Sequence, residues 1–554
     1  MPHSAADLIL LNGRFVTLDP QSRIVEALAI KDGRILALGS KDDVENVSGP
    51  GTERRDMSGR TVIPGIVDSH CHPDSAAARL AGWHNLEPAA VASREALLQR
   101  TAEAAAALPA GAWFAGYRFN ERKSGGYPSL AELDRASGGK PLFILRTDGH
   151  LGLANSAAFQ ALGIDNDSAD PPFGAFDHDP ETGALTGLVR ETAAHLFIDH
   201  IQAEDRVEGM MDGLETVFGE FLSYGITSAY NSLTSSKAIQ AYQRMKEAQR
   251  LKLRVGIIVS GREEGLVEAF VRAGIRSGFG DDLVRVIAVE WCPDCSTSGR
   301  TAAYYEPYVG ETVLGEPKDN TGMLLYELGD LRERATAAHR AGLQVCVEGV
   351  GDRGIDFALD VIESALEAHP ADDHRMRVEH CCYVTPELLA RIKRMQVIDS
   401  SATGFMYELG DAYRANRGAE AMGRMWPHRS LIDAGVPAPG HSDAYICTPN
   451  PFTAMWSMVN RLSDSGGTLD GPEAAPSQAV TIEEALRAYT LLGAYSGREE
   501  EIKGSLEPGK LADLAVLDRD ILSIPSEEIR EVQALASFVG GEEVYRRNGS
   551  DVSG

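Results

Sequence analysis

Short apolar runs alternate with amphipathic segments through the middle of the chain. Eight of these runs have the length of buried strands, and helical periodicity separates most of them, as in "DLRERATAAHRAG" and "TPELLARIKRM". This alternation predicts an α/β fold in which eight parallel strands close into a (β/α)8 TIM-like barrel. The predicted strands are residues 62–68, 225–231, 253–259, 284–290, 343–348, 377–381, 396–401 and 436–443.

Both ends of the chain have a different pattern, with apolar runs interrupted by turn signals. "ADLILLNGRFVTLD" and "ALAIKDGRILALGS" contain Asn-Gly and Asp-Gly, which are typical of hairpins. "GKLADLAVLDRD" and "ALASFVGGEEVYRR" near the other end have the same character. We therefore predict a small β-sandwich domain built from residues 1–61 and 500–554, with the barrel domain over residues 62–499.

The segment between the first and second predicted strands is too long for a loop. It contains helix and strand signals of its own, including "REALLQRTAEAAAAL" and "KPLFILRTDG". We expect an inserted subdomain at about residues 75–205 of the barrel domain.

Composition excludes several classes of function. The chain has 554 residues and a net charge of −28, and phosphate recognition needs clustered Lys and Arg, so we expect no nucleic-acid partner. No run approaches the roughly 18 apolar residues of a membrane span, and we find no signal peptide. The seven cysteines form no regular framework, so we expect a cytoplasmic protein. The CxxC spacing of Cys292 and Cys295 is weak support for a redox or zinc role.

Histidines follow the first predicted strand in "DSHCH". Residues i and i+2 of an extended segment point to the same side, so His70 and His72 can meet one metal ion. Four further strands end in groups that ligate metals or transfer protons, namely Glu290, Glu348, His380 and Asp443. The carboxyl ends of barrel strands converge on the active site, so we predict that all six side chains form one cluster.

Several motifs, taken in order, resemble the amidohydrolase superfamily and its amidohydrolase-3 type subgroup. "GRTVIPGIVDSHCH" is similar to the family's entry into the first barrel strand, and "RTDGHLGLANSAAFQALGI" to an insert motif with a pocket histidine, His150. "SGRTAAYYEPY", "RVEHCCYVTPELLARIK", "GVPAPGHSDA" and "LEPGKLADLAVLD" continue the likeness over nearly the whole chain.

This resemblance implies a centre of one or two divalent metals. His70 and His72 match the family's HxH pair, His380 its strand-six histidine, and Asp443 the aspartate that binds metal and moves a proton. Glu290 stands where many relatives have a lysine, and Glu348 where they have a histidine ligand. In the binuclear interpretation, which we favour, both acids are ligands. In the alternative, His70, His72 and Asp443 hold one ion, and Glu348 is a proton-transfer group.

The resemblance also implies the chemistry. Zinc is the first expectation, and the hard oxygen of Glu348 leaves room for Mn, Co or Fe. We predict hydrolysis of an amide-like carbon–nitrogen bond in a small organic molecule through a metal-activated water. Asp443 would transfer the proton and His150 would stabilise the oxyanion. Candidate substrate contacts are Arg300, Tyr117, Trp113 and Tyr407.

Two other functions stay open on the sequence. One is a non-hydrolytic reaction on the same scaffold, such as decarboxylation, isomerisation or hydration, because Glu290 and Glu348 depart from the family pattern. The other is a binding or regulatory protein whose catalytic site has decayed. We also expect that the chain can form a homo-oligomer, although no sequence feature determines the number of subunits.

Overall fold

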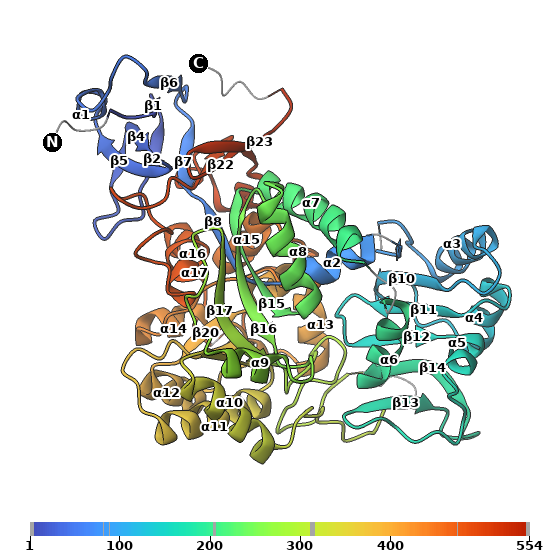
Figure 1. Cartoon of the computed structure of the whole chain (residues 1–554). Helices are drawn as coiled ribbons and strands as arrows, with labels where there is room; N and C mark the ends of the chain where they lie inside the picture. Colours follow the sequence, from blue (N-terminus) through green and yellow to red (C-terminus); the bar gives the residue numbers. More distant parts are fainter. Residues whose placement is uncertain are drawn as a thin grey trace.

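Seven parallel strands curve around a common core at the centre of the molecule, which confirms the predicted α/β barrel fold (Figure 1). This computed structural model describes residues 5–80, 82–87, 89–202, 206–310, 316–473 and 475–549. Neighbouring strands are hydrogen-bonded in one continuous order. In that order they are β8 (Ile66–Cys71), β15 (Ile226–Thr234), β16 (Arg254–Ser260), β17 (Val284–Trp291), β18 (Gln344–Gly349), β19 (Arg377–His380) and β20 (Ile398–Ser401).

The predicted eighth strand, residues 436–443, is an extended segment rather than a regular strand. It fills the gap between β20 and β8, since the Ser401 amide donates to the Pro439 carbonyl and the Asp443 amide to the His70 carbonyl. Pro437 and Pro439 have no amide hydrogen, so this segment cannot complete a strand ladder. The barrel is therefore closed by scattered hydrogen bonds on this side.

Helices surround the barrel and follow most of its strands. Their ends carry local signals, as at α12, where the Thr385 hydroxyl accepts from the Leu388 amide and Pro386 occupies the first turn. The helices are α7 (Val207–Ser223), α8 (Ser236–Glu247), α9 (Leu266–Ala273), α10 (Leu328–Arg340), α11 (Asp352–Ala368), α12 (Pro386–Met395), α13 (Thr403–Arg417), η1 (Ala421–Arg424), α14 (His428–Ala434), α15 (Pro451–Asn460), α16 (Ile482–Ala488), α17 (Leu491–Ser496) and η2 (Ser526–Glu531).

The first predicted strand, residues 62–68, is divided at Gly65 into two strands of different domains. β7 (Thr61–Pro64) belongs to a six-stranded sheet outside the barrel, and β8 opens the barrel. A Cβ atom at Gly65 would lie 2.0 Å from Thr227 Oγ1, so this crossing point accepts only glycine.

Two sheets at the upper left of Figure 1 form the β-sandwich. Strands from both ends of the sequence share the six-stranded sheet, and Leu10, Phe15, Leu28, Val62 and Phe538 contribute to the core between the sheets. One sheet is β5 (Arg34–Gly39), β4 (Ala27–Lys31), β1 (Leu8–Leu11) and β6 (Glu53–Asp56), with α1 (Lys41–Glu45) alongside. The other is β23 (Glu542–Arg546), β22 (Ala534–Val539), β21 (Leu514–Leu517), β7, β2 (Arg14–Val16) and β3 (Ile24–Val25). Residues 1–4 and 550–554 of the predicted domain lie outside the described residues.

Between β8 and β15 the chain forms a separate lobe, at the right of Figure 1. Its six-stranded sheet carries a core of its own, in which Phe143 stacks on Phe197 with ring centroids 5.3 Å apart. The sheet order is β13 (Gly174–His178), β14 (Leu185–Glu191), β12 (Leu151–Ala154), β11 (Leu142–Arg146), β10 (Phe114–Phe119) and β9 (His84–Asn85). The helices of the lobe are α3 (Arg94–Ala107), α4 (Leu130–Ser137), α5 (Ser156–Ala161) and α6 (Thr192–Gln202), whereas α2 (Pro73–Leu80), which comes before them in the insertion, packs against α7 of the barrel. Residues 203–205, at the predicted end of this insertion, lie outside the described residues.

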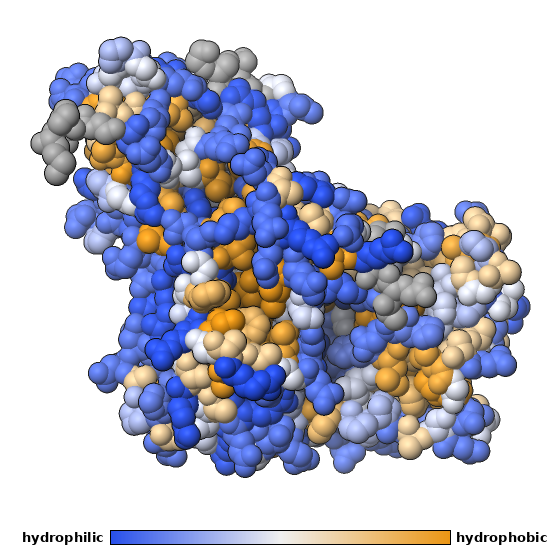
Figure 2. Space-filling model, viewed as in Figure 1, coloured by the Kyte–Doolittle hydropathy of each residue, from blue (hydrophilic) through white to orange (hydrophobic). Residues whose placement is uncertain are grey.

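Hydrophilic side chains cover most of the face drawn in Figure 2, in keeping with the net charge of −28. Among the helices of the described ranges, none has the length and apolar content needed to cross a bilayer.

Candidate metal centre and active-site cavity

A cavity of about 490 Å³ lies at the carboxyl ends of the barrel strands, where the insertion meets the barrel. All six predicted metal ligands line this cavity, and so does His150 from the insertion. We call the six side chains the strand-end cluster: His70, His72, Glu290, Glu348, His380 and Asp443.

Three members of the strand-end cluster converge on one point. Nε2 of His70 lies 3.4 Å from Oδ1 of Asp443, and Nε2 of His72 lies 2.9 Å from the same oxygen. His70 and His72 are two residues apart at the end of β8, and the Asp443 amide is hydrogen-bonded to the His70 carbonyl. The ligand atoms of these three residues lie within 4.8 Å of one another.

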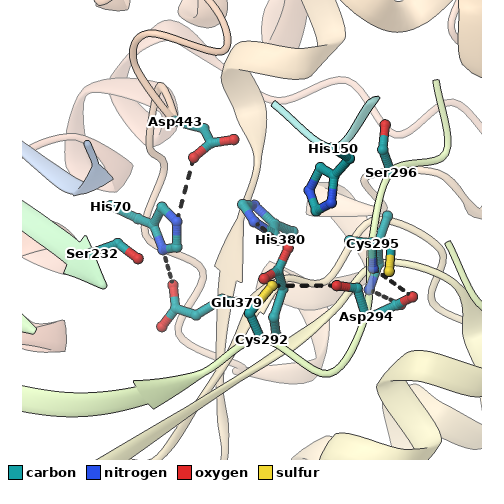
Figure 3. A network of polar contacts seen from close by, with 12 residues as sticks. His70, His150, Ser232, Cys292, Asp294, Cys295, Ser296, Glu379, His380 and Asp443 are labelled. Atoms are coloured by element: carbon teal, nitrogen blue, oxygen red, sulfur yellow. Dashed lines mark hydrogen bonds and ion pairs between the residues drawn. The ribbon is translucent and has the colours of Figure 1, made fainter. Parts of the chain in front are cut away.

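Hydrogen bonds at the other ring nitrogens orient both histidines. His70 Nδ1 contacts Glu379 Oε2 at 2.9 Å (Figure 3), and Arg377 in turn binds Glu379 at 2.6 Å. His72 Nδ1 faces the Ser232 carbonyl at 3.3 Å. Burial alone would raise the pKa of Glu379, but Arg377 and His70 hold it well below its usual range. When Nδ1 donates to such a partner, Nε2 presents its lone pair to a ligand, as in metal-binding histidines.

Buried polar atoms without hydrogen bonds mark the same region. Within the described residues, His70 Nε2, Glu290 Oε1, His380 Nδ1 and Asp443 Oδ1 are buried and make no hydrogen bond. Leaving such groups unpaired is costly. A divalent cation would satisfy nitrogen and carboxylate oxygen together, so the residues present fit a metal of the Zn, Mn, Co or Fe type.

The remaining acids of the strand-end cluster have partners within the protein. Glu348 Oε1 lies 3.0 Å from His380 Nε2, and Glu290 accepts a hydrogen bond from the Ser232 hydroxyl. Burial raises the pKa of Glu290. It would also raise that of Glu348, but His380 lowers the pKa of Glu348 to about 2. Glu348 and His380 therefore form an ion pair beside the group of His70, His72 and Asp443.

Backbone conformation helps the strand ends to present their side chains. Glu379 and His380 are adjacent in β19, where neighbouring side chains normally point to opposite sides. His380 has a φ of 67°, which turns the chain, and the two side chains contact His70 and Glu348 respectively. Asp443 also has a positive φ, of 56°. Left-handed backbone at non-glycine residues is uncommon and is held here by the surrounding structure.

His150 reaches the cavity from the turn between β11 and β12. Its Nδ1 lies 2.7 Å from Oε2 of the buried Glu191. Burial by itself would lower the pKa of His150, but Glu191 raises it to about 9. Figure 3 shows His150 on the other side of His380 from His70.

Four predicted substrate contacts lie outside the lining of the cavity. Arg300 is 3% exposed and binds Glu316 at 2.8 Å, so its charge is already paired. Trp113 packs on Phe197 inside the insertion, where Tyr117 also packs, and Tyr407 lies edge-on to Trp456. These three aromatic side chains are partly buried against apolar clusters, and their contact with substrate stays a prediction.

Several cavity residues were absent from the sequence prediction. Arg262 follows β16 and is a strand-end residue by the same logic as the others. Arg79 and His195 belong to helices of the insertion, where no periodic signal indicates a pocket. Cys292 lines the cavity, and both thiols of the CxxC are free and buried.

The barrel and its strand-end cluster define the class: a barrel protein with a candidate metal centre at the carboxyl ends of its strands. The chain belongs to the amidohydrolase family, whose model matches residues 53–545.

Known relatives agree with this assignment over the full length. The N-substituted formamide deformylase of Arthrobacter pascens is 28% identical over 98% of this chain and 99% of its own. A putative amidohydrolase of Bacillus subtilis is 26% identical over 97% and 99%. The crystal structure of an uncharacterised metal-dependent hydrolase from Pyrococcus horikoshii aligns with a TM-score of 0.74 and 25% identity, covering 94% of this chain and 99% of that one. The comparisons support a metal-dependent hydrolase in general terms.

Proposed function

We propose that this protein hydrolyses an amide-like carbon–nitrogen bond of a small organic substrate with the help of a divalent metal. The observation that carries the proposal is the convergence of His70, His72 and Asp443, with ligand atoms within 4.8 Å, inside a cavity at the barrel mouth. Membership of the amidohydrolase family and the similarity to a formamide deformylase support the reaction class.

His70, His72 and Asp443 would hold a single ion, with zinc as the first candidate. The hydrogen bond of Glu290 to Ser232 and the ion pair of Glu348 with His380 support one ion rather than two, because both acids have partners within the chain. When bound, the ion supplies a Lewis acid that polarises a carbonyl and lowers the pKa of a water molecule.

The protein's own groups provide positioning and proton transfer. Asp443 stays ionised, since His380, His70 and His72 outweigh its burial and keep its pKa well below its usual range. Its carboxylate can accept a proton from the attacking water and deliver it to the leaving nitrogen. His150, with Nδ1 fixed by Glu191, can donate from Nε2 to the oxygen that gains charge. Residues of the insertion form part of the cavity wall around these groups.

Metal content and activity test this proposal together. The purified protein is analysed for metals, treated with a chelator, reloaded with Zn, Mn, Co or Fe, and assayed on formamides and acetamides of small amines. We expect one ion per chain and activity that returns only with metal. His72→Asn should lose both, while His369→Asn, which removes an exposed imidazole outside the cavity, should retain both. A metal-free wild-type protein without metal-dependent amidase activity would contradict the proposal.

A non-hydrolytic reaction is the second candidate, because Glu290 and Glu348 are both buried at the site. Turnover in oxygen-18 water, with identification of the products, separates the two, since hydration also incorporates the label but leaves the carbon–nitrogen bond intact. Hydrolysis places the label in the product acid, whereas decarboxylation or isomerisation leaves the product unlabelled.

A further inference from the structure

Two guanidinium groups reach the cavity from elements other than the strand ends that carry the metal ligands. Arg79 lies in the last turn of α2, and Arg262 follows β16. His195 of α6 lines the same cavity, close enough to both arginines to feel their charges. Burial, and then the positive charges of Arg262, His150 and Arg79, lower the pKa of His195 well below its usual value. Positive charge therefore converges on this part of the cavity.

Neither guanidinium group has a carboxylate partner. Among the described ranges, no acid lies within ion-pair distance of Arg79 or Arg262, although the chain carries 81 Asp and Glu residues. Within the described residues, the guanidinium group of Arg262 donates one hydrogen bond, to the Cys292 sulfur at 2.7 Å, and Nε of Arg79 is buried without a hydrogen bond. By contrast, the buried Arg146 binds both Glu121 and Asp148.

Among the described residues, the acids that line the same cavity make no direct ion pair with these guanidinium groups, although the charge of Glu348 acts on Arg262 from a longer distance. Glu263, the residue after Arg262, accepts a hydrogen bond from the Ser236 amide at 2.8 Å at the start of α8. Asp199 makes no ion pair with either arginine within the described residues, and burial raises its pKa. An unpaired cation on a cavity wall is costly to hold unless an anion meets it.

We infer that Arg262, assisted by Arg79, forms an anion subsite, and that the substrate is an amide that also carries a carboxylate. This rests on the proposed function, because the reacting amide would lie at His70, His72 and Asp443. The planar fork of a guanidinium binds a carboxylate through two parallel hydrogen bonds, and Arg262 stands at a barrel-strand end that faces the cavity. Burial raises the pKa of the Cys292 thiol well above its usual value, so this partner of Arg262 is uncharged. A substrate carboxylate can therefore take its place as the hydrogen-bond acceptor.

Matched pairs of amides test the subsite on the metal-loaded full-length protein. Each pair has the same shape and differs in charge: N-acetylglycine with N-acetylglycinamide, and N-formylphenylalanine with its carboxamide. We expect the carboxylate member to have a KM about 10-fold lower. Arg262→Gln should raise that KM by about 10- to 100-fold, with kcat and the carboxamide values changed by less than about 2-fold. Arg262→Lys, which keeps the charge but not the fork, should lie between.

A binding readout separates this inference from the proposed function. The Tm of each metal-loaded variant is measured with 10 mM of either member of a pair. Arg272→Gln, on the exposed end of α9, is the control for loss of one guanidinium. If no amide is hydrolysed but carboxylates raise the Tm of wild type and Arg272→Gln, and not of Arg262→Gln, the subsite stands and the proposed function fails. If the two members of each pair have the same KM and raise the Tm by the same amount, the inferred subsite is wrong and the proposed function stands.

Discussion

Two sets of charged side chains in the cavity, the strand-end cluster and the pair Arg79 and Arg262, are held differently. Members of the strand-end cluster are fixed by further side chains, as His70 is by Glu379 and Glu379 is by Arg377. Arg79 and Arg262, on a helix and a loop, lack such support. Reacting groups need a fixed geometry, whereas recognition groups must exchange water for substrate. The comparison therefore assigns the chemistry to the strand-end cluster and the recognition of substrate to Arg79 and Arg262.

The largest expected effect is at Asp443 of the strand-end cluster. Asp443→Asn should lower kcat/KM by about 1000-fold, because it removes a metal ligand and the proton acceptor together. Steady-state kinetics and metal analysis check this, with Asp433→Asn on the outer surface of α14 as the control. A variant that keeps more than about a tenth of the activity would mean that Asp443 is not the proton acceptor. A variant whose function is unchanged would favour the alternative of a binding or regulatory protein whose catalytic site has decayed.

Glu348 decides between one ion and two. Glu348→Gln should lower kcat by about 100-fold, because it breaks the ion pair with His380. The metal content should stay at one ion per chain. A wild-type protein with two ions that falls to one in this variant would instead support the binuclear centre.

Glu379 lies behind the reacting groups, and its effect should be smaller. Glu379→Gln should weaken metal affinity by about 10- to 100-fold through the orientation of His70. Titration with a competing chelator measures this. At saturating metal, kcat should recover most of its wild-type value. An unchanged affinity would show that the Glu379 contact does not tune the ligand.

The insertion's contribution should appear as a modest pH effect on stability. The folded-state pKa of His150 is raised to about 9 from 6.5. Its pairing with Glu191 therefore stabilises the fold fully below about pH 6.5, and this stabilisation is lost as the pH rises through 9. We expect a loss of about 1 kcal/mol, since cavity water screens the pair. Thermal unfolding of wild type and Glu191→Gln from pH 6 to 10 tests it: the difference in stability between them should shrink over this range.

Strand ends could be predicted from the sequence, and side-chain pairing could not. Apolar runs followed by His, Glu or Asp located all six members of the strand-end cluster, because topology alone brings parallel strand ends together. The ion pair of Arg300 with Glu316 was not predictable, since nothing in the motif of Arg300 indicates this partner. Trp113 and Tyr407 have the composition of pocket walls but the surroundings of a packed core.

The irregular eighth strand shows that an apolar pattern can locate a strand position without predicting whether a regular strand forms there. Residues 436–443 occupy the expected position, yet Pro437 and Pro439 prevent a ladder. Arg262 was within reach of the strand-end rule, whereas Arg79 and His195 enter the cavity only through the way the insertion packs on the barrel.

The division of one sequence stretch at Gly65 has a consequence for how the protein is made. β7 pairs with β2 on one side and with β21, more than 440 residues later, on the other. While the ribosome synthesises the barrel, β7 has an open edge that can pair with another nascent chain. Once residues 514–517 have been synthesised, β21 covers that edge. A chain released from the ribosome before this point would carry a barrel joined to an incomplete sheet whose open edge can aggregate.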